Sequence, residues 1–326
     1  LTYAPMDACG CQLEAKLEGF KALAAGPVPK PREGGLGSTA RLEAGPAFRR
    51  INQVAAADDD WPTYRRDAAR SGAGSATVAS SLGLAWKMQL GARPTAPTIA
   101  AGRLFVATPD THTVHAMDAK QGDLLWSYTV GGRVDSPPTY YQGLVLFGSA
   151  DGYVYALEAE SGQLAWRFRA APVDRRVMVR QQLESAWPVH GSVLIHDGVL
   201  YCTAGRNMFL EGGIHFLRLD PLTGELLGEV VMDDRDPESG GEMQRTYLKK
   251  TQGNNMPVAL SDILSCDGRN IWMRSQKIDF QGNRLEIGLQ DVTEQPQEDC
   301  HLFCQAGFLD DSWFFRTYWT YGRRVS

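Results

Sequence analysis

The chain has 326 residues, of which 43% are hydrophobic, and its formal net charge at pH 7 is -5. This charge excludes a broad basic field for nucleic acid or an anionic membrane surface. No run of about 18 apolar residues occurs, so we expect no membrane-spanning helix. The 34 glycines and 17 prolines favour a turn-rich fold. The six cysteines are too few for a disulfide scaffold.

The region before Trp61 divides into two parts. Within residues 1–25, the stretch Gly19-Phe-Lys-Ala-Leu23 places a glycine and an aromatic residue before Ala-Leu, as does Gly152-Tyr-Val-Tyr-Ala-Leu157. We interpret residues 1–25 as a partial repeat unit, the end of a preceding unit or of one that closes a ring. Residues 26–60 are rich in Gly, Pro, Ala and charge, which predicts a linker or a surface-crossing loop.

A repeat with a constant period follows. The interval from Trp86 to Trp126 equals the interval from Trp126 to Trp166, and Gly122 and Gly162 are separated by the same interval. Short alternating strands and glycine turns lie between these positions. A period of about 40 residues with this pattern is typical of the four-stranded blade of a β-propeller. We therefore predict blades within residues 61–326.

The later repeats are longer and less regular. The interval from Gly162 to Gly224 is longer than the one from Gly122 to Gly162, so the extra residues should form loops. The predicted insertions are 170–184, 207–213, 233–253 and 279–300. We expect an all-β propeller of four-stranded antiparallel blades, about seven or eight when complete, of which this chain holds a part.

The pattern Gly-x-Val-x-Ala-Leu-(Asp/Glu), followed by Gly-x-Leu-x-Trp, resembles the pyrroloquinoline-quinone-type propeller repeat. In that family the tryptophan at the end of a blade packs between neighbouring blades. The resemblance implies structural roles for six residues: Trp86, Trp126, Trp166, Gly122, Gly162 and Gly224. The turn at Gly224 is retained, but its tryptophan is lost.

Two kinds of protein carry this repeat. Quinoprotein alcohol dehydrogenases hold the quinone and calcium in the channel and typically show adjacent cysteines, which this chain lacks. Scaffold propellers of the outer-membrane barrel-assembly type bind protein partners. We therefore expect a non-catalytic scaffold in the periplasm or cell envelope, with a protein or polysaccharide partner and no cofactor. The alternative is a PQQ- and calcium-dependent dehydrogenase or a carbohydrate-active enzyme.

Candidate binding residues lie where the period breaks or where inner strands begin. Charged side chains before the inner strands would surround the mouth of the channel, where they could hold a polar ligand or a cation, or join neighbouring blades as ion pairs. The candidates are Arg133, Asp135, Glu184, Trp187, Arg206, Glu211 and Asn254. No histidine has a metal-ligand spacing. Cys9 and Cys11, with Cys300 and Cys304, do not form a familiar zinc pairing, so no metal site is predicted.

Overall fold

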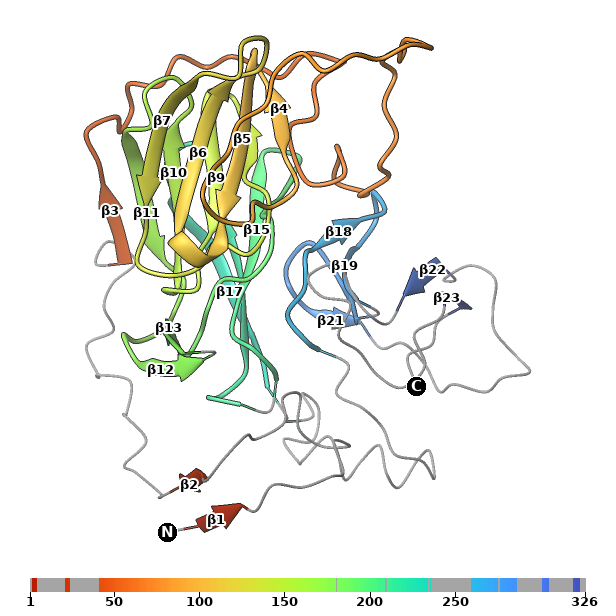
Figure 1. The fold of residues 1–326 in the computed structure, drawn as a ribbon. Helices are drawn as coiled ribbons and strands as arrows, with labels where there is room; N and C mark the ends of the chain where they lie inside the picture. The colour runs from red at the N-terminus through yellow and green to blue at the C-terminus, as the bar shows by residue number, and fades with distance from the viewer. Residues whose placement is uncertain are drawn as a thin grey trace.

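The computed structural model describes residues 41–179, 181–208, 210–233, 235, 259–274 and 276–285, together with the backbone of four further strands. These residues form an almost entirely β structure, in which four antiparallel sheets share the strand order of successive hairpins (Figure 1). The all-β fold with four-stranded antiparallel blades is confirmed. The total of seven or eight blades remains a prediction.

Each blade contains four strands joined in sequence order. Blade one consists of β4 (Thr98–Ala100), β5 (Arg103–Thr108), β6 (Thr113–Asp118) and β7 (Leu124–Thr129), with the 3-10 turn η1 (Pro109–Thr111) between β5 and β6. Blade two consists of β8 (Thr139–Tyr141), β9 (Leu144–Gly148), β10 (Tyr153–Glu158) and β11 (Leu164–Arg169). Blade three consists of β14 (Leu194–His196), β15 (Val199–Ala204), β16 (Ile214–Leu219) and β17 (Leu226–Met232). Blade four consists of β18 (Ser265–Cys266), β19 (Ile271–Met273), β20 (Gln276–Ile278) and β21 (Arg284–Leu285).

The turn that joins the third and fourth strands of a blade has a recurring chemistry. In blade one, the Asp118 carboxylate accepts hydrogen bonds from the backbone N–H groups of Lys120 and Gln121. Gly122 then adopts a φ of 78°, a left-handed conformation that glycine tolerates best. Asp220 accepts two equivalent bonds in blade three. An aspartate followed by a glycine one turn later is therefore the local signal that ends the third strand.

The apolar side chains fill three clusters, each shared by two neighbouring blades. Phe105 of blade one and Phe147 of blade two belong to the first cluster. Trp166 of blade two and Leu200 of blade three belong to the second. The third joins blades three and four. Burial of apolar area between blades is therefore the main force that holds neighbouring sheets together.

Tryptophan docking fixes two of these boundaries. The indole N–H of Trp126 donates to the Ala159 carbonyl at 3.0 Å, and that of Trp166 donates to the Pro221 carbonyl at 3.2 Å. A Cβ added to Gly162 would lie 2.6 Å from the Trp126 ring, and one added to Gly224 would lie 2.7 Å from the Trp166 ring. Each ring thus lies on the turn of the next blade, where only glycine leaves room.

Blade three has no tryptophan at this position. Its large side chain is on the third strand and its small residue is on the fourth. Trp126 is paired with Ala116, and Trp166 is paired with Ala156, across the third and fourth strands. At the same register position of blade three, Arg218 is paired with Gly228. A Cβ on Gly228 would overlap the Arg218 guanidinium. The large side chain has therefore moved from the fourth strand to the third.

Strands occur in three places where the sequence analysis expected loops. In the predicted linker 26–60, β3 (Leu42–Ala44) pairs with β11 and extends blade two. In the predicted insertion 170–184, β12 (Arg176–Val179) pairs with β13 (Gln182–Ser185) as a hairpin. In the polar stretch 279–300, β21 completes blade four. These strands are too short for a period-2 pattern to reveal them.

Residues 61–72 contact inner strands of several blades. Trp61 forms a two-way bridge with Ile99 of β4, and the Pro62 carbonyl accepts the Tyr140 N–H of β8. Further along, the Ala68 carbonyl accepts the Cys266 N–H of β18. This segment therefore lies against the inner strands rather than on the outer surface.

Arg70 is the buried centre of this segment, with 3% of its surface exposed. Its guanidinium donates to the carbonyls of Leu264 (2.9 Å) and Val193 (3.3 Å) and to the Thr63 hydroxyl (2.8 Å). Burial lowers the pKa of Arg70 to about 10, so the side chain is still charged at neutral pH. It joins the beginnings of the inner strands of blades three and four.

Besides the hairpin β12–β13, two further strand pairs lie outside the four blades. β1 (Thr2–Ala4) pairs with β2 (Lys21–Leu23), and β22 (His301–Cys304) pairs with β23 (Trp319–Gly322). The rest of residues 1–25 and residues 236–258 and 286–300, which include parts of the predicted partial blade and insertions, fall outside the described residues. Within the described part of the chain, no helix has the length and apolar character needed to cross a bilayer.

Candidate functional site

Four of the predicted site residues contribute to one charged cluster. Glu184, which is only 1% exposed, accepts a hydrogen bond from Arg133 Nε at 2.8 Å and lies 3.6 Å from Arg206 Nη2. Arg133 also lies 3.6 Å from Asp135. We call Arg133, Asp135, Glu184, His190 and Arg206 the mouth cluster. Its residues come from the connections that precede blades two and three and from the second connection of blade three.

His190 is the member that the sequence analysis missed. Its Nδ1 lies 2.7 Å from the Asp135 carboxylate. Asp135 precedes β8 by the same interval as His190 precedes β14, so the two occupy equivalent positions. Glu184 was expected to stand directly before the inner strand of blade three, but it lies in β13 of the inserted hairpin. Counting back from the inner strand would have found His190.

The mouth cluster is electrically balanced. Two arginines face two carboxylates, and the His190 imidazole adds a polar partner to Asp135. A carboxylate as buried as that of Glu184 requires such partners, because an unpaired buried charge costs several kcal/mol. The cluster also joins the connection before β8 to the hairpin β12–β13, to which Glu184 belongs. The arrangement therefore fixes the base of the hairpin.

The other predicted site residues lie elsewhere. Trp187 is 6% exposed and packs edge-on against His215, with ring centroids 6.5 Å apart. It is therefore part of the core between blades two and three rather than a free binding surface. Glu211 lies in the turn before β16 and does not belong to the mouth cluster. Asn254 is outside the described residues.

Three buried polar atoms near these residues find no hydrogen-bond partner among the described residues. They are Trp187 Nε1, Arg206 Nε and Glu211 Oε2. All three belong to residues around the start and the second connection of blade three. Buried polar atoms without partners are uncommon in folded proteins.

A second charged group, unforeseen from the sequence, joins blades two and three. Glu229 on β17 accepts hydrogen bonds from Arg41 (2.6 Å) and His215 (2.7 Å). Arg41 also donates to the carbonyls of Arg169 and Ala170 in blade two. Burial alone would raise the pKa of Glu229, but the two hydrogen bonds outweigh it and lower the pKa to about 2. Arg41 lies in the predicted linker, where no pattern indicated it.

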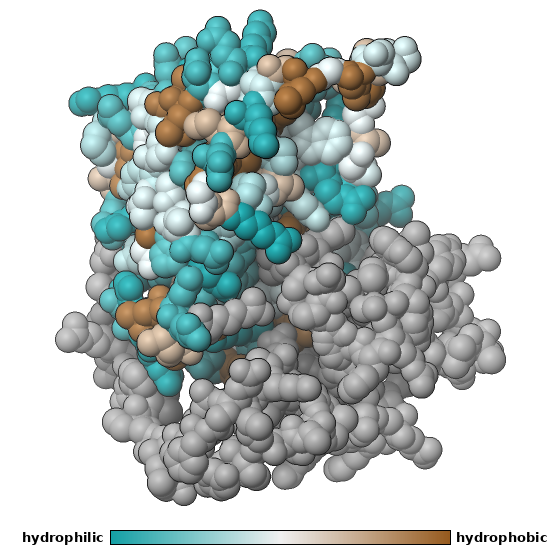
Figure 2. All heavy atoms as spheres, in the orientation of Figure 1, coloured by the Kyte–Doolittle hydropathy of each residue, from teal (hydrophilic) through white to brown (hydrophobic). Residues whose placement is uncertain are grey.

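The hairpin β12–β13 carries an exposed apolar pair. Met178 and Leu183 are directly opposite each other and are 70% and 50% exposed. Figure 2 shows hydrophobic atoms over this hairpin, beside hydrophilic ones. His112 Nε2 of blade one lies 3.1 Å from the Gln182 amide oxygen, which adds a second support. The hairpin therefore presents apolar surface from a fixed base.

The repeated four-stranded sheets, the docking tryptophans and the apolar clusters shared by neighbouring blades define a β-propeller of the PQQ-like type. The chain belongs to the family described as outer membrane protein assembly factor BamB, whose model matches residues 68–246. No curated protein matches the chain significantly.

Several solved structures are similar to parts of this chain. The quinohemoprotein alcohol dehydrogenase ADHIIG from Pseudomonas putida HK5 is 20% identical, with a TM-score of 0.51, over 66% of this chain and 34% of that chain. The quinohemoprotein alcohol dehydrogenase from Comamonas testosteroni is 21% identical, with a TM-score of 0.47, over 60% and 31%. BamB from Moraxella catarrhalis is 16% identical, with a TM-score of 0.30, over 58% and 59%. The chain thus spans about a third of the length of the two dehydrogenases.

Proposed function

We propose that the protein is a non-catalytic scaffold that binds a protein partner through the hairpin β12–β13. The exposed pair Met178 and Leu183 is the observation that carries this proposal. Apolar side chains presented together on a surface gain free energy when a partner removes them from water. A hairpin held in place by Glu184 and Arg133 loses little conformational freedom on binding, which favours affinity.

The mouth cluster would form the polar rim of this surface. Protein interfaces commonly place an apolar centre beside polar groups that set orientation and partner choice. The family description, which names outer membrane protein assembly, supports a role in assembling other proteins. We accordingly propose a location outside the cytoplasm, in the periplasm or cell envelope.

The described residues of the mouth cluster do not fit the calcium of the dehydrogenase alternative. Calcium takes six to eight oxygen ligands. Asp135 and Glu184 are the carboxylates of the mouth cluster, and both are already paired with Arg133. Among the described residues, no group of three or more His, Cys, Asp or Glu side chains could hold a metal ion. Neither calcium nor the quinone therefore has a role in the proposed function.

Site-specific photocrosslinking in cells that make the protein tests the proposal. A photoreactive residue at Met178 or Leu183 should yield adducts with one defined protein, whereas the same residue at Val231, which is 45% exposed on β17, should not. Equal labelling at all three positions would contradict the proposal. Adducts with polysaccharide alone would identify a glycan partner instead. Stoichiometric uptake of PQQ with calcium, followed by absorbance, would also overturn the scaffold role.

A further inference from the structure

Trp86 docks on blade one as Trp126 docks on blade two. Its indole N–H donates to the Ala119 carbonyl at 3.1 Å. A Cβ added to Gly122 would lie 2.5 Å from the Trp86 ring. Residues 84–90 therefore hold the place, relative to blade one, that the fourth strand of a blade holds relative to the next blade.

Among the described residues, Trp86 has no alanine paired with it on a neighbouring strand, unlike Trp126 and Trp166. Trp126 and Trp166 are enclosed on their own blade by a paired alanine, and they are 9% and 0% exposed. Within the described part of the chain, no strand pairs with residues 84–90. Trp86 is only partly buried, and Leu84 is 84% exposed. Residues 84–90 thus occupy the place of the fourth strand of a preceding blade, but among the described residues no third strand lies beside them.

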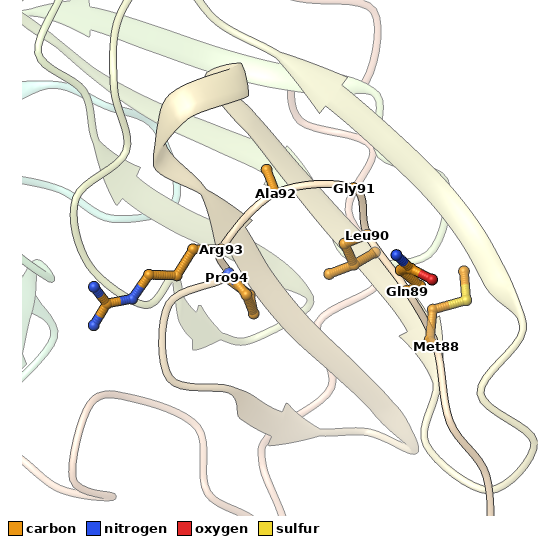
Figure 3. A pocket seen from close by; sticks show the side chains of 7 residues that line it. All are labelled: Met88, Gln89, Leu90, Gly91, Ala92, Arg93 and Pro94. Atoms are coloured by element: carbon orange, nitrogen blue, oxygen red, sulfur yellow. The ribbon is translucent and has the colours of Figure 1, made fainter.

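A pocket lies along this unpaired segment. It is lined by Met88, Gln89, Leu90, Gly91, Ala92, Arg93 and Pro94 (Figure 3). All of its lining comes from one stretch of chain. Its lining segment belongs to no sheet of the described residues.

The separate pair β1–β2 has the register of the second and third strands of a blade. In β1–β2, Tyr3 is opposite Ala22, and Thr2 is opposite Leu23. In blade two, Leu146 is opposite Ala156, and Val145 is opposite Leu157. In blade one, Phe105 is opposite Ala116, and Leu104 is opposite Met117. An alanine followed by a large apolar residue thus occupies the same register position in all three pairs.

We propose that β1–β2 docks on residues 84–90 as the second and third strands of a further blade, with Ala22 opposite Trp86. Ala22 would then take the register position that Ala116 and Ala156 hold opposite their tryptophans. In Figure 1 the β1–β2 pair lies at the bottom of the view, apart from blade one. In the docked arrangement it would lie beside residues 84–90.

The connecting chain is long enough for this docking. Residues 24–40 separate β2 from Arg41, which is bound to blade two. A fully extended segment of this length spans up to about 60 Å, which exceeds the roughly 30 Å diameter of a small domain. Docking would cover Leu84 and the open face of Trp86, and it would pair the free edge.

A cysteine pair tests the proposed register directly. Tyr155 is opposite Arg167 in blade two, next to the pair formed by Ala156 and Trp166. By the same register, Lys21 should lie opposite Lys87, and opposed strand residues are close enough for a disulfide. In the full chain, Lys21→Cys/Lys87→Cys should form an intramolecular disulfide, mapped by peptide mass spectrometry, at least about tenfold faster than Lys21→Cys/Arg269→Cys. Equal rates would overturn the proposal. A disulfide formed only between chains would overturn it too, and would assign the surface to a second copy.

Hydrogen exchange gives a test that needs no cysteine. In the full chain, Ala22→Glu should place a charge against Trp86 and raise amide exchange at residues 84–90 at least about tenfold. Exchange in β7 should not change, which separates loss of docking from loss of folding. Ala25→Glu, beyond the end of β2, is the matched control. Unchanged exchange at residues 84–90 in Ala22→Glu would contradict the proposal.

Discussion

The boundary between blades two and three differs from the boundary between blades three and four. At the first, Trp166 is fully buried against Gly224, and Arg41 and Glu229 add an ion pair. At the second, Gly282 of blade four meets Phe216 and Val230 in place of a tryptophan. Both boundaries are closely packed, so a blade boundary requires a filled volume over a glycine turn rather than one particular residue.

Blade three has an arginine–glycine pair, Arg218 and Gly228, where blades one and two have an alanine–tryptophan pair. This difference explains how the second boundary could lose its tryptophan. A tryptophan at position 228 would need the space that the Arg218 side chain now holds. Residues across the two strands must therefore change together. This coupling is a general property of close-packed interiors, in which one added large side chain has to be offset by a loss nearby.

Acid should affect the first boundary most strongly. Glu229 has a folded-state pKa of about 2, below the ordinary value of 4.5. A lowered carboxylate pKa stabilises the fold above about pH 4.5, and this stabilisation disappears as the pH falls through about 2. It amounts to at most about 3 kcal/mol. Glu229→Gln should therefore flatten the dependence of unfolding free energy on pH in this window, measured by urea denaturation.

The matched control for this prediction is Glu43→Gln. Glu43 forms an exposed ion pair with Arg167, and exposed pairs contribute little to stability. Its variant should keep the acid dependence of the unmodified protein. If Glu229→Gln and Glu43→Gln have the same pH profile, the Arg41–Glu229–His215 group does not carry the acid sensitivity.

Alanine at Gly224 should cost more than alanine at Gly102. Both glycines have a φ of 72°, so both substitutions incur the same backbone strain. A Cβ at Gly102 meets nothing within 4 Å, whereas one at Gly224 meets Trp166 at 2.7 Å. The difference in unfolding free energy should be about 1–3 kcal/mol, as for other overpacked sites. Equal losses in thermal or urea denaturation would show that the tryptophan contact is not tight.

The smallest expected effect is a coupling at the second boundary. Gly228→Trp alone should destabilise the protein, because the indole and the Arg218 guanidinium would occupy one space. Arg218→Ala/Gly228→Trp restores the alanine–tryptophan pair of blades one and two, so its loss should be smaller than the sum of the single losses. A coupling of about 1 kcal/mol is expected for residues in contact. Additive losses in a double-mutant cycle would contradict this view of blade three.

The regular blades could be predicted from the sequence, because the constant spacing repeats the same turn and docking residues. Trp126 and Gly162 lie in different blades and meet as the repeat requires. The sequence also grouped Arg133, Asp135 and Glu184, and the structure brings these three side chains together, whereas their place at a channel mouth stays a prediction. Trp126 and Gly162 were predictable because each keeps a fixed position within the period, whereas Glu184 belongs to the inserted hairpin β12–β13.

Other features could not be read from the sequence because nothing local encodes them. Arg41 pairs with Glu229 across 188 residues, and neither residue belongs to a motif. Trp187 looked like a surface candidate because it stands near an insertion, but it packs against His215. The strand β3 is short and owes its existence to the free edge of β11. In all three examples, contacts between residues distant in the sequence determine the structure.

Residues 61–72 have a consequence for the order in which the chain folds. This segment is synthesised before any of the four blades, yet the carbonyl that Arg70 Nε binds belongs to Leu264, which is 194 residues later. Contacts this distant in sequence slow folding, because a long loop must close before they form. Blades can assemble one after another from their local hairpins. The bond between Arg70 and Leu264 can form only after Leu264 has left the ribosome, so an early segment completes its contacts late.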